Sequence, residues 1–454
     1  MSLRPPLRVT PAVQRRPRAQ RLLRAGLPAL LLIAAAAGAR AQSLQELYDA
    51  ARGYDATYLA ARALADSAQY RNEQVKALNR PNVGLSASST RSETDTSLGR
   101  SGSTTTGASI SASQSLFNRP NSVSIDQAEK NLVIASADLA LAEQDLIIRL
   151  SQAYFDVLAS QDALGTTRAN KTGIAEQLAS AKRAFEVGTA TITDTREAQA
   201  RYDLALAQEI AAENDLRVKR IALDQLVGRA GVEPRPLLLP AQLPTVTPAN
   251  AEDWVSRSVD SPSVRKAQLG YDIAQLETTK ARAGHLPTVA LVGSVGESHS
   301  NRNTSTGLSG NTTQAQVGVQ LNLPLFAGYS IQNRVKETLS LEEKSRNDLE
   351  AARRSVTLAT RQAFSSLQSG EASVKALEAA EASNKLALEA TQLGYKVGVR
   401  VNLDVLNAQT QLFTTQRDLA RARYDVLLGN LRLRQATGTL KPEDVVNVSR
   451  QLAP

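Results

Sequence analysis

The chain repeats itself once, and this duplication restricts its fold more than any other feature of the sequence. Residues of the same type recur at an offset of 206 to 210 positions. The matched pairs are Pro81 with Pro287, Leu116-Phe117 with Leu325-Phe326, Gly188 with Gly398, Ala198-Gln199 with Ala408-Gln409, and Gly228 with Gly438. A unit of this size is longer than a solenoid repeat. The sequence therefore predicts two copies of one large unit, 42–228 and 262–440, joined by a proline-rich segment, 229–261.

Long helices are predicted in both units because proline is absent from residues 121–233 and 325–441. Apolar residues recur there every seven positions, as in a coiled coil. They are Leu132, Leu139 and Leu146 in the first unit and Val405, Leu412, Leu419 and Val426 in the second. A helix from Asn121 to Val187 extends roughly 100 Å at 1.5 Å per residue. We expect a rod rather than a globule.

Each unit also contains two predicted strands. In the second unit Val317, Val319, Leu321, Leu323 and Leu325 alternate with polar residues and glycine, and in the first Ala108, Ile110 and Ala112 alternate with serines. Polar loops at 93–104 and 298–312 join the strands of each pair. Alternation of this kind with long polar loops is typical of an outer-membrane β-barrel. Because four strands cannot close a barrel, the chain must then oligomerise. The alternative is a small soluble sheet that caps the rods.

The first 41 residues are interpreted as a secretory signal peptide. They carry eight arginines and no acidic residue, then an apolar run from Leu27 to Ala37 and the cleavage motif Ala39-Arg40-Ala41. Without these arginines the formal charge of the chain falls from +9 to about +1, so its basicity gives no support to nucleic-acid binding. The chain has no cysteine, which excludes disulfides, thiolate metal sites and a lipidated cysteine.

The two expected helix turns carry a specific resemblance. They read VGTATITD from Val187 and VGVRVNLDVLNAQ from Val397, and the chain from Asp418 to Leu440 reads DLARARYDVLLGNLRLRQATGTL. These segments resemble the periplasmic tips and the last helix of the TolC family, and the resemblance extends over nearly all of residues 43–440. It implies an α+β fold: a homotrimer with a twelve-stranded transmembrane β-barrel and a periplasmic α-barrel of coiled coils.

The resemblance also implies a function and a location. Such proteins are outer-membrane exit ducts that conduct proteins or small toxic molecules. They work with a periplasmic adaptor protein and an inner-membrane pump, either ABC-type or proton-driven. The sequence has no phosphate-binding loop ending in GK[ST], so energy must come from a partner. The absent cysteine favours the branch that serves type I secretion and multidrug efflux over the lipoprotein branch.

Site residues follow from the same resemblance. Thr193, Asp194, Tyr395 and Arg400 match the bonds that close the periplasmic gate. Asp404 and Asn407 match the positions that line the aperture, and Asn407 replaces the second aspartate of the best-known members. Gly188 and Gly398 match the turns that meet the adaptor.

Other functions have little support in the sequence. The two histidines, His285 and His299, are expected at a helix end and in a polar loop, without metal-ligand spacing. No nucleophile motif is present, so we expect no catalysis and no cofactor. The rival hypothesis is a secreted periplasmic coiled coil that acts as a spacer or adaptor without a pore. Residues 441–454 form a C-terminal tail to which the sequence gives no role.

Overall fold

The computed structural model describes residues 42–97, 99–238, 243–244, 246–301 and 309–452. The leader expected at residues 1–41 lies outside this part of the chain. Helices and strands in the first half follow the order α2 (Leu44–Tyr54), α3 (Ala56–Lys76), β1 (Asn82–Thr96), β2 (Gly99–Phe117), α4 (Arg119–Glu186) and α5 (Ile192–Val227). A short 3-10 helix, Ala77–Asn79, connects α3 to β1.

The second half repeats this order. Its elements are α6 (Ala251–Ser258), α7 (Pro262–Arg282), β3 (Thr288–Ser300), β4 (Gly310–Asn322), α8 (Ser330–Lys396) and α9 (Asn402–Ala436), followed by α10 (Pro442–Ser449). A 3-10 helix, Ala283–His285, again precedes the first strand. The predicted succession of helix, strand, loop, strand, long helix, turn and helix is confirmed in both halves.

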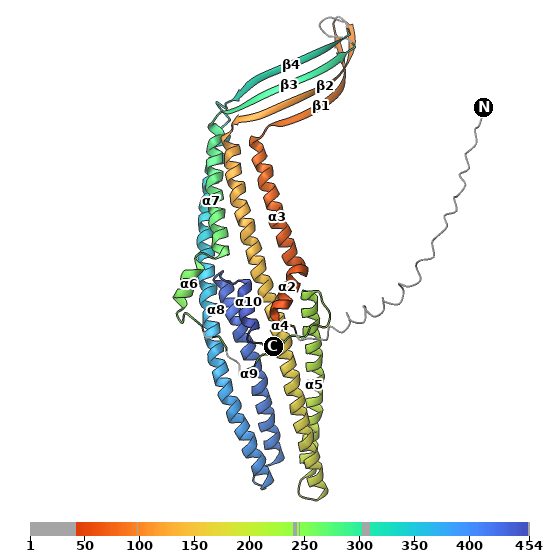
Figure 1. Cartoon of the computed structure of the whole chain (residues 1–454), viewed down its shortest axis with the longest axis vertical. Coiled ribbons are helices and arrows are strands. Elements are labelled where there is room, and N and C mark those ends of the chain that lie inside the picture. The colour runs from red at the N-terminus through yellow and green to blue at the C-terminus, as the bar shows by residue number, and fades with distance from the viewer. Residues whose placement is uncertain (1–41, 98, 239–242, 245, 302–308, 453–454) are drawn as a thin grey trace, which may run out of the picture.

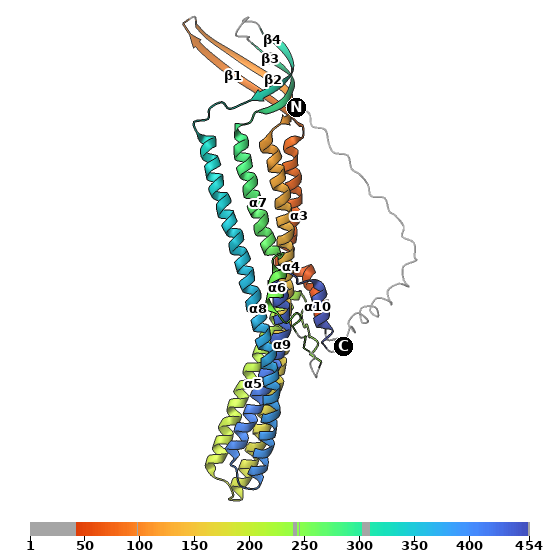
Figure 2. The same cartoon turned by 90° about the vertical axis from the view of Figure 1, so that its left-hand side faces the viewer.

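The molecule is a long rod with a sheet at one end. Figure 1 shows the four strands at the top and the turns α4–α5 and α8–α9 at the bottom, and Figure 2 shows the same separation from the side. The 68 residues of α4 and the 67 of α8 each extend about 100 Å. Below the middle of the rod, α4 packs against α5 and α8 against α9. Above it, α3, α4, α7 and α8 lie side by side in that order.

Local sequence explains where the long helices begin and end. Asn118 caps α4 through its side chain, which accepts a hydrogen bond from the backbone of Asn121 at 3.1 Å, and Pro120 lies in the first turn, where a missing N–H costs nothing. The heptad residues Val405, Leu412, Leu419 and Val426 are all buried along α9. The predicted coiled-coil seam is therefore correct in this half.

The four strands form one antiparallel sheet in the order β1-β2-β3-β4. One row across the sheet pairs Leu85 with Ile110, Ile110 with Val295 and Val295 with Ala315. The neighbouring row consists of Ser86, Ser109, Gly296 and Gln314. Because side chains alternate between the two faces of a sheet, one face is apolar and the other polar. The predicted alternation is confirmed.

Two details of the strand prediction are wrong. Most of the expected loop 93–104 is strand, because its serines and threonines pair across the hairpin and Arg100 forms an ion pair with Glu93 at 2.6 Å. His299 likewise lies in β3 rather than in a loop. At the other end β4 stops at Asn322, before Leu323 and Leu325. Pro324 lacks the N–H that a ladder needs, which explains the early end.

The main hydrophobic core lies at the middle of the rod, where α2 and α10 pack on the long helices (Figure 1). The C-terminal tail is part of this core: Val445, Val448 and Leu452 are buried there. Leu452 also forms an isolated bridge with Leu237 in the joint between the halves.

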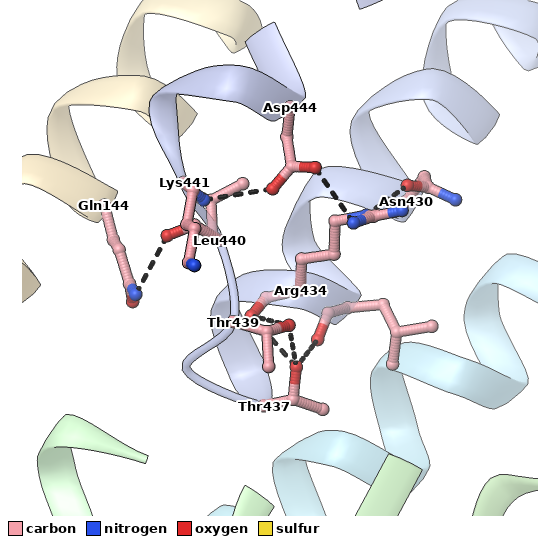
Figure 3. Close-up of polar contacts among 9 residues, drawn as sticks. Gln144, Asn430, Arg434, Thr437, Thr439, Leu440, Lys441 and Asp444 are labelled. Atoms are coloured by element: carbon pink, nitrogen blue, oxygen red, sulfur yellow. Dashed lines mark hydrogen bonds and ion pairs between the residues drawn. The ribbon is translucent and has the colours of Figure 1, made fainter. Parts of the chain in front are cut away.

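A polar turn holds α10 in place (Figure 3). The carboxylate of Asp444 accepts bonds from the backbone of Lys441 at 3.0 Å and from Arg434 Nη1 at 2.9 Å. Gln144 of α4 donates to the carbonyl oxygens of Gly438 and Leu440, both at 3.2 Å. The end of the second half is thereby fixed to the long helix of the first.

Candidate functional site

The turn between α4 and α5 forms the first helical tip. Gly188 has φ +77°, a left-handed conformation that side chains with a Cβ rarely adopt. Thr191 and Asp194 form a capping box at the start of α5: the carboxylate of Asp194 accepts from the backbone N–H of Thr191 at 2.9 Å and from its hydroxyl at 2.8 Å. The backbone N–H of Asp194 donates back to Thr191 Oγ1 at 3.2 Å. Thr193 is exposed on the same turn.

The turn between α8 and α9 forms the second tip with the same geometry. Gly398 has φ +79° and is exposed, and an added Cβ would meet open space. Arg400 Nη1 lies 3.7 Å from Asp404 Oδ2, and this carboxylate also faces the backbone N–H of Val401 at 3.4 Å. Tyr395 is half-buried in the last turn of α8. Its carbonyl oxygen accepts from the backbone of Gly398 at 3.1 Å.

The structure does not bring all the expected gate residues together within one chain. Arg400 and Asp404 form an ion pair, and Asp194 bonds to its own cap residue. In the described part of the chain, neither Thr193 nor Asp194 has a hydrogen bond or ion pair with Tyr395 or Arg400. Each tip is therefore a self-contained turn whose charged groups are exposed or half-exposed.

One contact near the tips joins the two halves directly. Arg201 of α5 donates from Nη2 to Asn407 Oδ1 of α9 at 3.1 Å. Asn407 is exposed, whereas Val405 and Leu406 beside it are buried in the seam. Asp404 and Asn407 lie three residues apart and therefore on the same side of α9.

Further along the rod, α9 is fixed to α4 by polar groups. The amide of Gln409 donates to the carbonyl oxygen of Asn170 at 3.1 Å in a buried position. The hydroxyl of Tyr424 donates to Asp162 Oδ2 at 2.7 Å, and burial raises the pKa of both groups. A neutral Tyr424 is thus retained as the donor at neutral pH. These bonds hold the α8–α9 pair against the α4–α5 pair.

A second candidate surface is the apolar face of the sheet. Its exposed large side chains come from all four strands: Val83, Leu85, Ile110, Leu291, Val295, Val317, Val319 and Leu321. Fully burying one such side chain stabilises it by about 1.5–3 kcal/mol relative to exposure. Eight of them on one face are a large unfavourable surface in water. The face requires an apolar environment.

The sheet has two free edges, and so does the layer of helices next to it. Strands β1 and β4 lie at the two sides of the sheet, and among the described residues each pairs on one side only. Helices α3 and α8 lie at the two sides of the helical layer beneath it. On the α3 side, Leu64, Ala68, Val75, Ala128 and Ile134 help to line a mainly apolar groove of about 490 Å³ between α3 and α4. Both layers therefore end in surfaces suited to another copy.

The described residues contain no group of three or more metal-ligating side chains. Over the same part of the chain, no helix combines the length and the apolar character needed to cross a membrane.

The sequence singles out neither Arg201 nor the close approach of the Gln409 side-chain amide to the backbone of Gly173. Both depend on how α9 lies against α4 and α5, which the heptad pattern does not specify. In the sequence, Gln409 stands out only as the counterpart of Gln199 in the internal repeat. The sole available signal was a glycine within an otherwise glycine-poor helix.

The comparisons with known proteins agree on one family. The family model described as "Outer membrane efflux protein" matches residues 47–229 and 258–439. The chain is 33% identical over 414 residues to the outer membrane protein TolC of Vibrio cholerae serotype O1, covering 91% of this chain and 94% of that protein. It is 33% identical over 305 residues to the alkaline protease secretion protein AprF of Pseudomonas aeruginosa, covering 66% and 63%.

Among solved structures, the outer membrane protein VceC of Vibrio cholerae superposes with a TM-score of 0.75 at 18% identity. The match covers 87% of this chain and 96% of VceC. At this identity the likeness concerns the fold.

Proposed function

The chain belongs to the outer membrane efflux protein family and is an outer-membrane exit duct, and we propose that three copies form its continuous conduit. The duct lies in the outer membrane and extends far into the periplasm. It moves cargo without chemistry of its own. The observation that carries the proposal is the sheet, which has one uncovered apolar face and two free edges at the end of a rod about 100 Å long.

The free edges support closure into a ring. Unpaired backbone groups in lipid cost several kcal/mol each, so a membrane-spanning sheet must leave none. Pairing β4 of one copy with β1 of the next removes both edges, and it places α8 of one copy beside the α3–α4 groove of its neighbour. Three copies give the twelve strands that the resemblance implies.

The position of the apolar face supports the orientation. If the apolar face points outward, it contacts lipid. The opposite face then lines a polar lumen with the row of Ser86, Ser109, Gly296 and Gln314. The rival hypothesis of a pore-less periplasmic spacer leaves the apolar face in water. We therefore do not favour it.

The energy for transport comes from partner proteins, since a duct of this kind has no site of its own for an energy-supplying ligand such as ATP. We propose a periplasmic adaptor and an inner-membrane pump, and a cargo of proteins, small toxic molecules or both. The names of two relatives support both kinds of cargo: one is an alkaline protease secretion protein and another a solvent efflux pump outer membrane protein.

The helical tips form the gate in this proposal. Arg400 and Tyr395 of one tip bond to Thr193 and Asp194 of an adjacent tip when the channel is closed. Charge-assisted bonds at an exposed site hold such a closure and break at small cost. Asp404 and Asn407 line the aperture, and the exposed turns at Gly188 and Gly398 contact the adaptor. The open space around both glycines supports this assignment.

The division of the chain stays a proposal as well. We assign residues 1–41 to a cleaved leader, 42–228 and 262–440 to the two repeats, 229–261 to the joint and 441–454 to the C-terminal segment. The two separate ranges matched by the family model support this division.

Native mass spectrometry of the mature protein, residues 42–454, tests the assembly. We expect a three-chain complex that stays in solution only with detergent. A monomer that is soluble without detergent contradicts the proposal and favours the spacer.

A further inference from the structure

Asn407, one of the two residues proposed to line the aperture, is bonded to a cationic side chain. Asn407 accepts a hydrogen bond from the guanidinium group of Arg201 at 3.1 Å, and this contact is exposed. Three residues earlier, Asp404 is paired with Arg400 at 3.7 Å. In each chain, the guanidinium groups of Arg201 and Arg400 thus lie beside Asn407 and Asp404, of which only Asp404 carries a carboxylate.

In the described part of the chain, no acidic group of α5 forms an ion pair with Arg201, whose side chain bonds to Asn407. Asp203 follows Arg201 by two residues and therefore lies about 200° from it around the helix. Its carboxylate accepts a hydrogen bond from Gln199 at 2.9 Å. Glu197 lies one turn nearer the tip on the side of Arg201, and within the described residues it forms no ion pair.

We propose that Arg201 sets the ion selectivity of the duct. It places a positive charge beside Asn407, whereas an acidic residue at position 407 would strengthen the preference for cations. The inference rests on the proposed function, since it requires the start of α9 to line the aperture. It follows that anions and anionic cargo meet a smaller barrier at position 407 than they would if this position carried a carboxylate.

The test measures reversal potentials of the full-length mature trimer in a planar bilayer under a KCl gradient. Arg201→Gln removes the charge and retains a hydrogen-bonding amide. Its matched control is Arg196→Gln, which removes one charge five residues earlier on a different side of the exposed tip of α5. Arg201→Gln removes one charge from each of the three chains. We expect it to raise the ratio of K⁺ to Cl⁻ permeability by at least about two- to fivefold, which is the effect of a single unit charge a few ångström from the ion path in water. Arg196→Gln should change the ratio much less.

A double-mutant cycle isolates the contact. Asn407→Asp should shift selectivity only slightly while Arg201 neutralises the new carboxylate, and strongly in the Arg201→Gln background. Equal shifts in both backgrounds, or equal effects of Arg201→Gln and Arg196→Gln, overturn the inference while the channel itself is intact. Absence of any conductance from the wild-type trimer contradicts the proposed function and this inference with it.

Discussion

The side-chain amide of Gln409 lies directly over the backbone of Gly173, where α9 crosses α4. A methyl group at position 173 would overlap this amide, and the same amide donates a buried hydrogen bond to the carbonyl oxygen of Asn170. Glycine inside a helix costs about 1 kcal/mol relative to alanine. Its presence at this position is explained by the approach of Gln409.

Replacing Gly173 by Ala should separate the two coiled-coil pairs near the tips. Although alanine favours the helix by about 1 kcal/mol, the overlap displaces Gln409 and breaks its buried bond, and overpacking typically costs 1–3 kcal/mol. We expect a lower unfolding temperature and a leakier channel in bilayer recordings.

The companion variant for this test is Gln409→Ala, which removes the overlapping group. In that background Gly173→Ala should be neutral or slightly stabilising, because only the gain in helix propensity remains. A loss of stability of equal size in both backgrounds would show that Gln409 is not the reason for the glycine.

Arg400→Ser should raise single-channel conductance by loosening the tips, and Tyr395→Phe should add to the effect. Loss of one charge-assisted hydrogen bond weakens the closed state by about 1.5–3 kcal/mol if the bond is shielded from water, and by less if the bond is exposed. Lys396→Ser is the control, because it removes one exposed charge from the same tip without touching the proposed gate. Unchanged conductance in Arg400→Ser removes the gate assignment.

Asp55→Asn should weaken the junction of α2, α3 and α4 in a pH-dependent way. The carboxylate accepts two bonds from Arg149, both at 3.0 Å, and caps α3 through the backbone of Tyr58 at 2.8 Å. The hydrogen bonds from Arg149 are the main reason why the pKa of Asp55 is lowered. Stability from this pair is therefore present above the unfolded pKa of about 3.9 and is lost as pH falls through the lowered native pKa.

Thermal unfolding at pH 7 and at successively lower pH values tests this. At pH 7 the variant should lose about 1–3 kcal/mol, and the difference from wild type should shrink in acid. Asp145→Asn is the matched control: Asp145 binds the same Arg149 at 2.6 Å, yet its side chain is half-exposed. A pH-independent difference for Asp55→Asn would show that the cap, rather than the charge, accounts for the loss.

Leu64→Arg should prevent assembly without unfolding the rod. In the single chain Leu64 is 65% exposed and lines the groove between α3 and α4. If α8 of a neighbouring copy fills this groove, a charge there is buried without a partner. Native mass spectrometry should then show monomers, whereas Ala63→Arg, on the adjacent exposed side of α3, should remain trimeric. Trimers in both variants would place the interface elsewhere.

Much of the fold could be predicted because it depends on local patterns. The missing prolines and the heptads of Val405 to Val426 indicate long coiled coils, and the alternation around Ile110 and Val317 indicates strands with one apolar face. The ends of the strands were harder to predict. Polar hairpin residues such as Thr94 and Ser101 form ladders as readily as loops, and Pro324 ends β4 before the apolar alternation stops.

The candidate site could be predicted only in part. The turns at Gly188 and Gly398 are local, because each requires a left-handed residue. The partners of their charged neighbours are not local. The contact of Arg201 with Asn407 depends on the packing of α5 beside α9, and the docking of α10 by Asp444 and Arg434 depends on a turn without sequence periodicity.

Planar-bilayer conductance of the purified mature protein, after its subunits have been counted by native mass spectrometry, tests the central claim most directly. The account predicts small conductance steps from a detergent-solubilised trimer, with larger steps from the Arg400→Ser trimer. A protein that is soluble without detergent and conducts no ions in either form would contradict the claim that this chain is an outer-membrane duct.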